Sequence, residues 1–340
     1  MALDEHTSGK LTVRQAAFIG VGAMVGAGIF SLLGAAGEVA GAAVWLSFLL
    51  AGAIALLQGY SFAKFGARYP SAAGLLEYVV RGLGNGHVTG IIAWLILAAN
   101  AIVTGMVAVS FGSYASAAFA DGSTTWIKVF AVLLVLAMTL LNIVGSQAVA
   151  RTQTVIVYVV LTILTLFAVT TLANLDVDLL AFSGYPPLRD IVSSIALTFF
   201  AFLGFGVVTF TAKDLADPSR QLPRAIYLAL GIATVIYVAV ALGVFGTLTP
   251  DEVISSGGTA LAVAAEPVLG RVGYWLMSVT ALFSTAGATN AGLYPAAGCA
   301  RRWRRSASFR RCWVAGSEGA RRLGCSSPPR WRSSWPPGST

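Results

Sequence analysis

The chain has 340 residues, of which 57% are hydrophobic and 11% are charged, whereas soluble domains carry about 25% charged residues, so an ordinary water-soluble enzyme is excluded. The net charge of +8 would suggest a nucleic-acid partner. Residues 1–298, however, carry 12 Lys and Arg against 13 Asp and Glu, and residues 299–340 carry ten Arg and one acid, so no nucleic-acid partner is expected.

Eight stretches of residues 1–298 contain no charged side chain, and the shortest has 22 residues. A helix needs roughly 20 apolar residues to cross a hydrocarbon core of about 30 Å. The sequence therefore predicts an all-α polytopic membrane protein with eight spanning helices. The stretches are 15–37, 39–63, 82–120, 129–150, 152–175, 191–212, 225–250 and 272–300.

The loop charges predict the orientation of these helices. With the N-terminus in the cytoplasm, nine Lys and Arg of residues 1–298 fall on the cytoplasmic side and three on the outer side. This bias follows the positive-inside rule. The acids near the N-terminus and the length of the first apolar run argue against a cleavable signal peptide. We expect a multi-pass protein of the cytoplasmic (inner) membrane.

The first predicted helix holds four glycines at positions 20, 22, 26 and 28. Each glycine inside a helix costs up to about 1 kcal/mol relative to alanine. One interpretation is close helix packing, because Gly22 and Gly26 form a small-xxx-small pair. The favoured interpretation is an interrupted helix whose freed N–H groups face a polar cavity near the middle of the membrane.

The sixth predicted helix repeats this pattern, with Gly204 and Gly206 in mid-span among four phenylalanines. Two glycine-interrupted helices five positions apart are typical of a transporter built from two inverted five-helix halves. Freed N–H groups at a helix start suit a carboxylate, and freed carbonyls suit an ammonium or a cation. A zwitterionic solute fits this arrangement better than a sugar or a fatty acid.

Few polar side chains fall inside the predicted spans, and none of the mid-span residues is charged. Most of the hydroxyls are expected to bond to carbonyls of their own helix. Asn100, Ser284 and Thr285 are the polar residues singled out for function. Residues 1–298 show no hydrolase triad, phosphate-binding loop or metal-ligand cluster, so no cofactor and no metal is expected.

Three ordered segments resemble the amino acid–polyamine–organocation (APC) permeases. The segment Gly22–Phe30 reads GAMVGAGIF and resembles the first-helix signature of this superfamily. The segment Arg68–Gly74 is similar to its loop between helices 2 and 3. Residues 199–205 followed by 213–226 resemble its interrupted sixth helix and the loop after it. The resemblance covers residues 10–298.

The resemblance implies a five-plus-five inverted repeat that moves amino acids or amines by proton symport, exchange or uniport. It also implies a binding site formed by two short segments. The residues implied to hold the substrate carboxylate and amine are Ala23, Met24, Gly26, Ala27 and Gly28, with Phe200 as an aromatic gate and Phe202, Leu203 and Gly204 lining the pocket.

The sequence departs from the superfamily pattern where ion coupling would be decided. An acid often found in helix 6 is Gly206 here, and the first acid of the following loop is Lys213. Helix 5 has Val159 or Val160 where some proton-coupled relatives place a lysine. The sequence therefore assigns no residues to a proton pathway. The candidates for ion or proton coupling are Ser284, Thr285 and Lys213, the last with the alternative role of a cytoplasmic anchor.

Residues 299–340 differ in composition from the rest of the chain, being rich in Arg, Ser, Gly, Pro and Trp and free of Lys, Ile and Asn. This composition is typical of a GC-rich gene read in another frame, so we expect a frameshift product that truncates the second repeat. The alternative is a basic tail that binds anionic lipid. Without helices 9 and 10, the face of helix 8 formed by residues 284–290 is expected to face lipid, and the chain to be unstable or inactive.

The sequence therefore predicts secondary transport of amino acids across the cytoplasmic membrane by alternating access. The expected partners are an amino acid, the lipid bilayer and protons, and no enzyme activity is expected. Two alternatives stay open: a permease for another small solute such as a polyamine or nucleobase, and a non-transporting sensor or inert protein.

Overall fold

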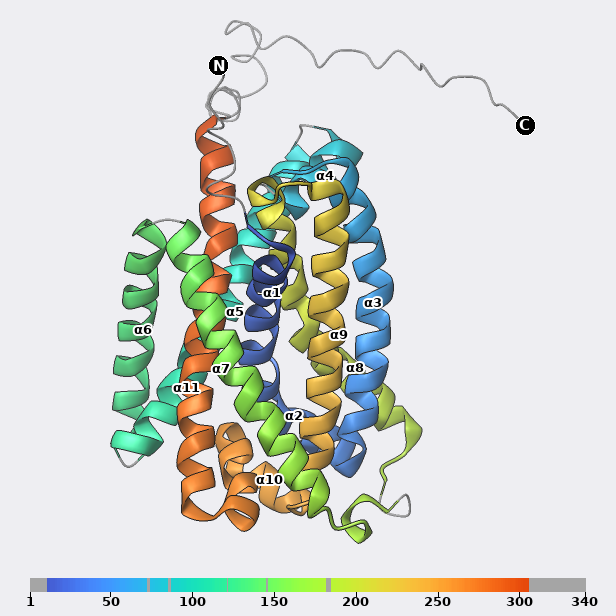
Figure 1. The fold of residues 1–340 in the computed structure, drawn as a ribbon, viewed down its shortest axis with the longest axis vertical. Helices are drawn as coiled ribbons and strands as arrows, with labels where there is room; N and C mark the ends of the chain where they lie inside the picture. Colours follow the sequence, from blue (N-terminus) through green and yellow to red (C-terminus); the bar gives the residue numbers. More distant parts are fainter. Residues whose placement is uncertain are drawn as a thin grey trace, which may run out of the picture.

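The computed structural model describes residues 11–71, 74–84, 87–120, 122–144, 146–181 and 185–305, with side chains omitted at Ala27, 144–151 and 294–305. The described part is a bundle of helices (Figure 1). It contains one isolated backbone bridge, between Leu11 and Leu215, and no named strand. Its main elements are α1 (Val13–Ala27), α2 (Ile29–Ala40), α3 (Val44–Arg68), α4 (Leu75–Leu83), α5 (His87–Phe119), α6 (Thr124–Val144), α7 (Ser146–Ala173), α8 (Leu188–Phe202), η4 (Leu203–Asp214), α9 (Pro218–Phe245), α10 (Pro250–Ser256) and α11 (Ala260–Arg305), joined in part by the short 3₁₀ turns η1 (Gly41–Ala43), η2 (Asp178–Leu180) and η5 (Gly257–Thr259).

The all-α membrane fold is confirmed. Within the described ranges, seven helical stretches are long and apolar enough to cross a membrane, and Val13–Gly26 is a shorter apolar helix. The difference from the eight predicted spans lies at the first one. There only the short turn η1, which begins at Gly41 (φ +51°), separates α2 from α3, so that Ile29–Arg68 counts as one apolar stretch and α1 stands apart.

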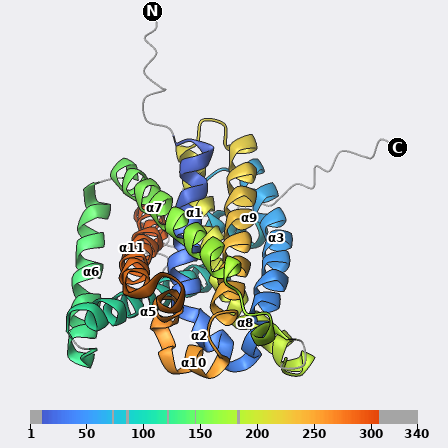
Figure 2. The same ribbon diagram turned by 60° about the horizontal axis from the view of Figure 1, so that its bottom comes forward.

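Helix α1 is the central helix of the bundle. It packs against α7, α9, α11 and η4, and both views show it enclosed by α7, α9 and α11 (Figures 1 and 2). Its apolar side chains are buried around the whole circumference, as for Ala16, Ile19, Val21 and Met24. A helix that is apolar on every side belongs in the interior of a large bundle.

Helix α6 lies at the edge of the bundle, as both views show (Figures 1 and 2). It packs mainly on α5 and α11. Leu136, Leu140 and Ile143 on its outer side are more than half exposed. Apolar side chains that face outward on a long helix are suited to contact with lipid, because hydrocarbon does not penalise them.

Two short helices, α4 and α10, lie at opposite ends of the bundle (Figure 1). Uncharged stretches could not predict them, because both are short and contain charges. Helix α10 carries a local signal, since Thr249 and Glu252 form a capping box in which the Glu252 N–H donates to the Thr249 hydroxyl. That S/T-x-x-E pattern is readable in the sequence.

Helix α11 is bent at Gly270, whose φ of +64° is a conformation that favours glycine. Beyond this kink, Ser284, Thr285, Thr289 and Asn290 are almost completely buried. The expectation that this face of the helix would be exposed to lipid is wrong. It is covered because α11 packs against α1, α5, α6 and α7.

Candidate substrate site at two interrupted helices

The first helix is interrupted at Gly28, between α1 and α2. Its backbone angles, φ −85° and ψ −81°, lie outside the α-helical range. The Gly28 N–H donates to the Met24 carbonyl at 2.7 Å, and the Ser31 hydroxyl donates to the Gly26 carbonyl at 3.4 Å. The first N–H groups of a helix carry a partial positive charge. Donation from the N–H groups at the start of α2 to a carboxylate stays a prediction.

The sixth helix changes its winding in mid-span. Helix α8 ends at Phe202, and the chain continues as the 12-residue 3₁₀ helix η4. The Leu203 N–H donates to the Phe200 carbonyl, an i→i+3 bond. Runs of 3₁₀ helix beyond three or four residues are uncommon, and inside a helix they often mark a functional hinge.

Glycines bring the two interrupted helices into backbone contact. A methyl group on Gly204 would lie 2.7 Å from backbone atoms of Ala23 and Met24. A methyl group on Gly28 would lie 2.7 Å from the Cβ of Ala201, in the last turn of α8. Because real Cβ atoms do not approach other atoms this closely, only glycine fits at these two positions without a shift.

Tyr237 of α9 joins the two interruptions. It is fully buried, and its hydroxyl donates to the Ala201 carbonyl at 3.2 Å. A methyl group on Gly28 would collide with the same hydroxyl, and the Tyr237 ring meets the Phe202 ring edge-on at 5.0 Å. Sequence reasoning missed this residue, because a tyrosine within an apolar helix has no local pattern that distinguishes a bridging role.

The predicted binding residues are partly brought together. Gly204 of η4 meets Ala23 and Met24 of α1, close to Gly28, as described above. The side chain of Ala27 lies outside the described residues. Phe200 is half-buried, Phe202 is fully buried and Leu203 is 45% exposed. Their contacts with a substrate stay predictions.

The predicted coupling residues of α11 lie beside α1. A methyl group on Gly26 would collide with the Ser284 carbonyl. The Thr285 hydroxyl donates to a carbonyl one turn earlier at 2.6 Å, as expected for hydroxyls in apolar helices. Val160 borders the same place, whereas Val159 is 42% exposed. The gap between these helices is too narrow for a water molecule and is lined by Val21, Gly22, Val25, Ile156, Val157, Val160, Leu161 and Ser284.

Asn100 and Lys213 are not part of the contact between the interruptions as the structure describes it. Asn100 is half-buried on α5. Lys213 is exposed in the last turn of η4. It follows Gly204 by nine residues, which is roughly 18 Å along a 3₁₀ helix. Any effect of Lys213 on a substrate at the interruptions would therefore be indirect.

Three amides form a buried chain that sequence reasoning missed. Asn142 of α6 donates to the Asn290 side chain at 2.8 Å, and Asn290 donates to Gln153 of α7 at 3.4 Å. Within the described ranges, the Gln153 Nε2 has no hydrogen-bond partner, and it lies against Gly22. Amides inside apolar spans are a usable signal, because buried polar groups in membrane helices are costly and tend to be functional.

The ends of the two interrupted helices nearest α4 are also joined. The Leu11 N–H donates to the Asp214 carbonyl at 2.6 Å, forming a short parallel bridge between Leu11 and Leu215. Thr12 then caps α1 in a capping box with Gln15. This backbone bond connects the start of α1 to the end of η4.

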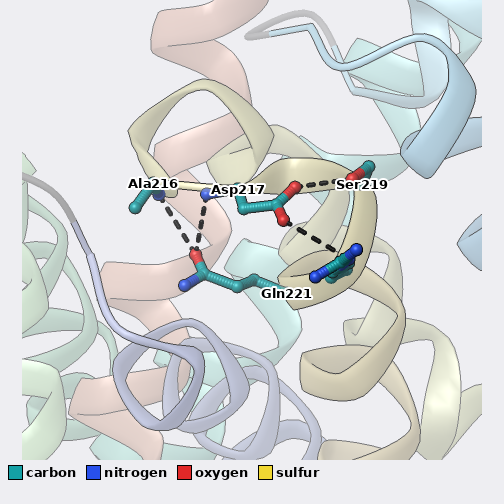
Figure 3. A network of polar contacts seen from close by, with 5 residues as sticks. Ala216, Asp217, Ser219 and Gln221 are labelled. Carbon is teal, nitrogen blue, oxygen red and sulfur yellow. Dashed lines mark hydrogen bonds and ion pairs between the residues drawn. The ribbon is translucent and has the colours of Figure 1, made fainter.

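The loop that follows η4 is held by a polar network, drawn in Figure 3. The Gln221 side chain accepts hydrogen bonds from the backbone N–H groups of Ala216 (3.1 Å) and Asp217 (3.2 Å). The Ser219 hydroxyl donates to Asp217 at 2.5 Å, and Arg220 lies 3.8 Å from the same carboxylate. Ser219 and Arg220 hold the Asp217 pKa below its ordinary value. The network fixes the turn at which α9 begins.

These features define a helical membrane protein with interruptions in its first and sixth helices. The amino acid permease family matches residues 11–309, and the chain belongs to this family. The inner membrane transport protein YbaT of Escherichia coli K12 is 37% identical over 278 residues, which is 81% of this chain and 65% of YbaT. The uncharacterized protein MJ0609 of Methanocaldococcus jannaschii is 33% identical over 317 residues, 91% of this chain and 73% of that protein. The vacuolar cationic amino acid transporter 4 of Arabidopsis thaliana is 30% identical over 277 residues, 73% of this chain and 45% of that protein.

The chain thus spans less than two thirds of the length of YbaT and less than half of the Arabidopsis transporter. The family match supports a multi-pass membrane protein of a family that moves small solutes. The names of YbaT and of the Arabidopsis protein describe transporters, not enzymes. The resemblance to APC permeases is confirmed.

Proposed function

We propose that the chain transports amino acids across the cytoplasmic membrane by alternating access, with its N-terminus in the cytoplasm. The observation that carries this proposal is the close approach of the interrupted helices, where Gly204 meets the backbone of Ala23 and Met24 and Gly28 meets the Ala201 Cβ. Small movements of α1 against η4 would open or close this contact. The proposed activity requires no covalent chemistry, cofactor or metal.

The substrate is proposed to be a zwitterion lying between these helices. Its carboxylate would accept hydrogen bonds from the N–H groups at the start of α2, and its ammonium would donate to carbonyls at the end of α1. Names of relatives support an amino acid, including the branched-chain amino acid permease BcaP of Bacillus subtilis, 26% identical over 249 residues. Asn100, Phe200, Phe202 and Leu203 are proposed to contribute to specificity.

A second candidate is transport of another small solute. The methylthioribose transporter of Bacillus subtilis is 28% identical over 249 residues. Polyamines and nucleobases belong to the same alternative. Competition of labelled amino acid uptake by a panel of these solutes separates the two candidates.

Coupling to protons is proposed to involve the region of Ser284 and Thr285, and Lys213 more remotely. Uptake measured with and without an imposed proton gradient tests this point. Acceleration by an inward proton gradient supports symport, and equal rates support exchange or uniport. No interaction with nucleic acid is proposed.

Residues 299–340 are proposed to come from an altered reading frame, on the grounds of their composition. The nucleotide sequence around codon 299 tests this, because a neighbouring frame should encode an apolar helix. The idea fails if both other frames are polar or contain early stops. Uptake should be measured for this chain beside a frame-restored version, and we expect weak or no uptake by this chain and clear uptake by the restored one.

The decisive experiment is uptake of labelled amino acids into proteoliposomes by the frame-restored protein and two glycine variants. Gly204→Ala places a methyl group against α1, whereas Gly206→Ala, two residues away, places it in open space. We expect Gly204→Ala to lower uptake at least tenfold and Gly206→Ala to leave it nearly unchanged. Equal uptake by both variants, or none by the unaltered protein, would contradict the proposal.

A further inference from the structure

A polar cleft of about 300 Å³ lies at the end of the bundle that holds α4. It is formed where α3 ends, where α4 runs and where η4 ends, so three separate elements contribute side chains. It lies near the cytoplasmic ends of the helices in the proposed orientation, remote from the helix interruptions. The lining residues are Arg68, Tyr69, Pro70, Ser71, Glu77, Arg81 and Lys213.

The cleft carries an excess of positive charge. Arg68, Arg81 and Lys213 line it, against one carboxylate, Glu77. Glu77 is engaged by Arg81 at 3.1 Å and by the Ser71 hydroxyl at 3.4 Å. Across the part of the chain that the structure describes, no carboxylate lies within 4.0 Å of the charged groups of Arg68 or Lys213. Two positive charges are therefore left for a ligand.

The two arginines are held in place before any ligand binds. The Arg68 and Arg81 guanidinium carbons lie 5.8 Å and 5.1 Å from the centre of the Tyr69 ring. Stacking on a tyrosine restrains a guanidinium and leaves its N–H groups available. The ion pair with Glu77 adds a second restraint on Arg81. A pre-positioned pair of guanidiniums loses less entropy when it binds an anion.

We propose that this cleft binds a phosphate group, supplied by the head group of an anionic phospholipid or by a soluble phosphate. The planar guanidinium fork matches two phosphate oxygens, and a lysine adds a point charge. A volume of about 300 Å³ is several times the share of one water molecule in liquid, so it has room for a phosphate with part of its substituent. Basic pockets between membrane helices commonly hold anionic head groups.

The position of Lys213 gives such binding a mechanical effect. Lys213 belongs to η4, whereas Arg68 ends α3 and Arg81 belongs to α4. A phosphate that contacts all three would hold the end of η4 against α3 and α4. A ligand favours the conformation to which it binds best, so phosphate would favour the arrangement of η4 seen here.

Native mass spectrometry of the purified full chain tests the proposal. Phosphatidylglycerol retained by the protein is compared with phosphatidylcholine, for the unaltered chain and the double variant Arg68→Gln/Lys213→Gln. We expect retention of phosphatidylglycerol to be about 25-fold weaker in the double variant, from the usual attraction of two surface cations to anionic lipid. Lys64→Gln is the matched control, because Lys64 is an exposed basic residue of α3 stacked on Tyr60 and does not line the cleft.

Further measurements distinguish a lipid head group from a soluble phosphate, and a further variant tests whether a loss of binding reflects misfolding. If the lipid head group is the ligand, the unaltered chain retains phosphatidylglycerol while millimolar inorganic phosphate leaves its melting temperature unchanged. If soluble phosphate is the ligand, millimolar inorganic phosphate raises the melting temperature of the unaltered chain but not of the double variant. The variant Arg68→Lys/Lys213→Arg keeps both charges but loses the Arg68 guanidinium stacked on Tyr69, so it should bind more tightly than the double variant and less tightly than the unaltered chain. Both variants alter exposed side chains, so folding should be preserved.

Equal phosphatidylglycerol and phosphate binding by the unaltered chain and the double variant would overturn the proposal. The proposal would also be overturned if Lys64→Gln lost as much phosphatidylglycerol binding as the double variant. The attraction would then be a general property of the basic surface. These measurements record binding rather than uptake. A failure of the proposed transport function would leave their result unaffected.

Discussion

The close approach of Gly28 to Tyr237 predicts a strong energetic coupling between these residues. Gly28→Ala introduces a methyl group that collides with the Tyr237 hydroxyl and lies 2.7 Å from the Ala201 Cβ. Overpacking of this kind costs about 1–3 kcal/mol. Since Gly28 is not helical, the helix propensity of alanine does not compensate.

Removal of the hydroxyl should relieve part of this cost. Tyr237→Phe alone loses the hydrogen bond to the Ala201 carbonyl, worth about 1 kcal/mol. In the double variant Gly28→Ala/Tyr237→Phe, the hydroxyl oxygen that clashes most closely with the new methyl group is gone, although the contacts with the Ala201 Cβ and the Met24 carbonyl remain. We therefore expect the double variant to be more stable than the sum of the single effects, by about 1 kcal/mol or more.

The assay is thermal unfolding of the unaltered protein, Gly28→Ala, Tyr237→Phe and the double variant, all purified under the same conditions in detergent. For a chain of 340 residues, a change of 1 kcal/mol should shift the melting temperature by about 1–2 °C. Gly206→Ala is the control, because its methyl group meets nothing within 4 Å. A coupling energy below about 0.5 kcal/mol, within the usual error of additivity, would refute the contact between Gly28 and Tyr237.

Three further substitutions test other parts of the bundle by the same measurement. Gly112→Ala should destabilise the protein by about 1–3 kcal/mol, because the methyl group would strike a carbonyl of α6, whereas Gly105→Ala on the same helix meets open space and should be neutral or stabilising. Thr249→Ala removes the cap of α10 and should cost about 1 kcal/mol; an unchanged melting temperature would contradict the cap. Asn290→Leu breaks the buried amide chain and leaves the Gln153 Oε1 unpaired, so the free energy of unfolding should fall by about 1–3 kcal/mol. An unchanged melting temperature would show that these amide hydrogen bonds do not stabilise the protein.

Most of the architecture could be predicted from where charges are absent. Charged residues are costly in hydrocarbon, so their positions set outer limits for the spans. They did not mark the helix ends. Helix α9 begins at Pro218, seven residues before the predicted stretch, because a helix can continue through a charged interface and proline suits the first helical position. Short helices such as α4 contain charges and were invisible to this criterion.

The candidate site was predictable in its backbone and not in its side-chain contacts. Glycine patterns indicated interruptions at Gly28 and near Gly204, because glycine clusters are unfavourable in an ordinary helix. The bridge through Tyr237 and the amide Gln153 depends on helices distant in sequence, and no local period reveals it. The wrong exposure expected for the Ser284–Asn290 face has the same origin, since burial there is decided by neighbouring helices.

The 3₁₀ winding of η4 makes the length of the sixth helix adjustable. Twelve residues span roughly 24 Å as a 3₁₀ helix and about 18 Å as an α-helix. Rewinding η4 into α-helix would draw Asp214 about 5 Å toward Gly204 and rotate its side chains about the axis. Because the Leu11 N–H is bonded to the Asp214 carbonyl, the start of α1 would be pulled along the same axis. A change of pitch in η4 would therefore move the start of α1 as well.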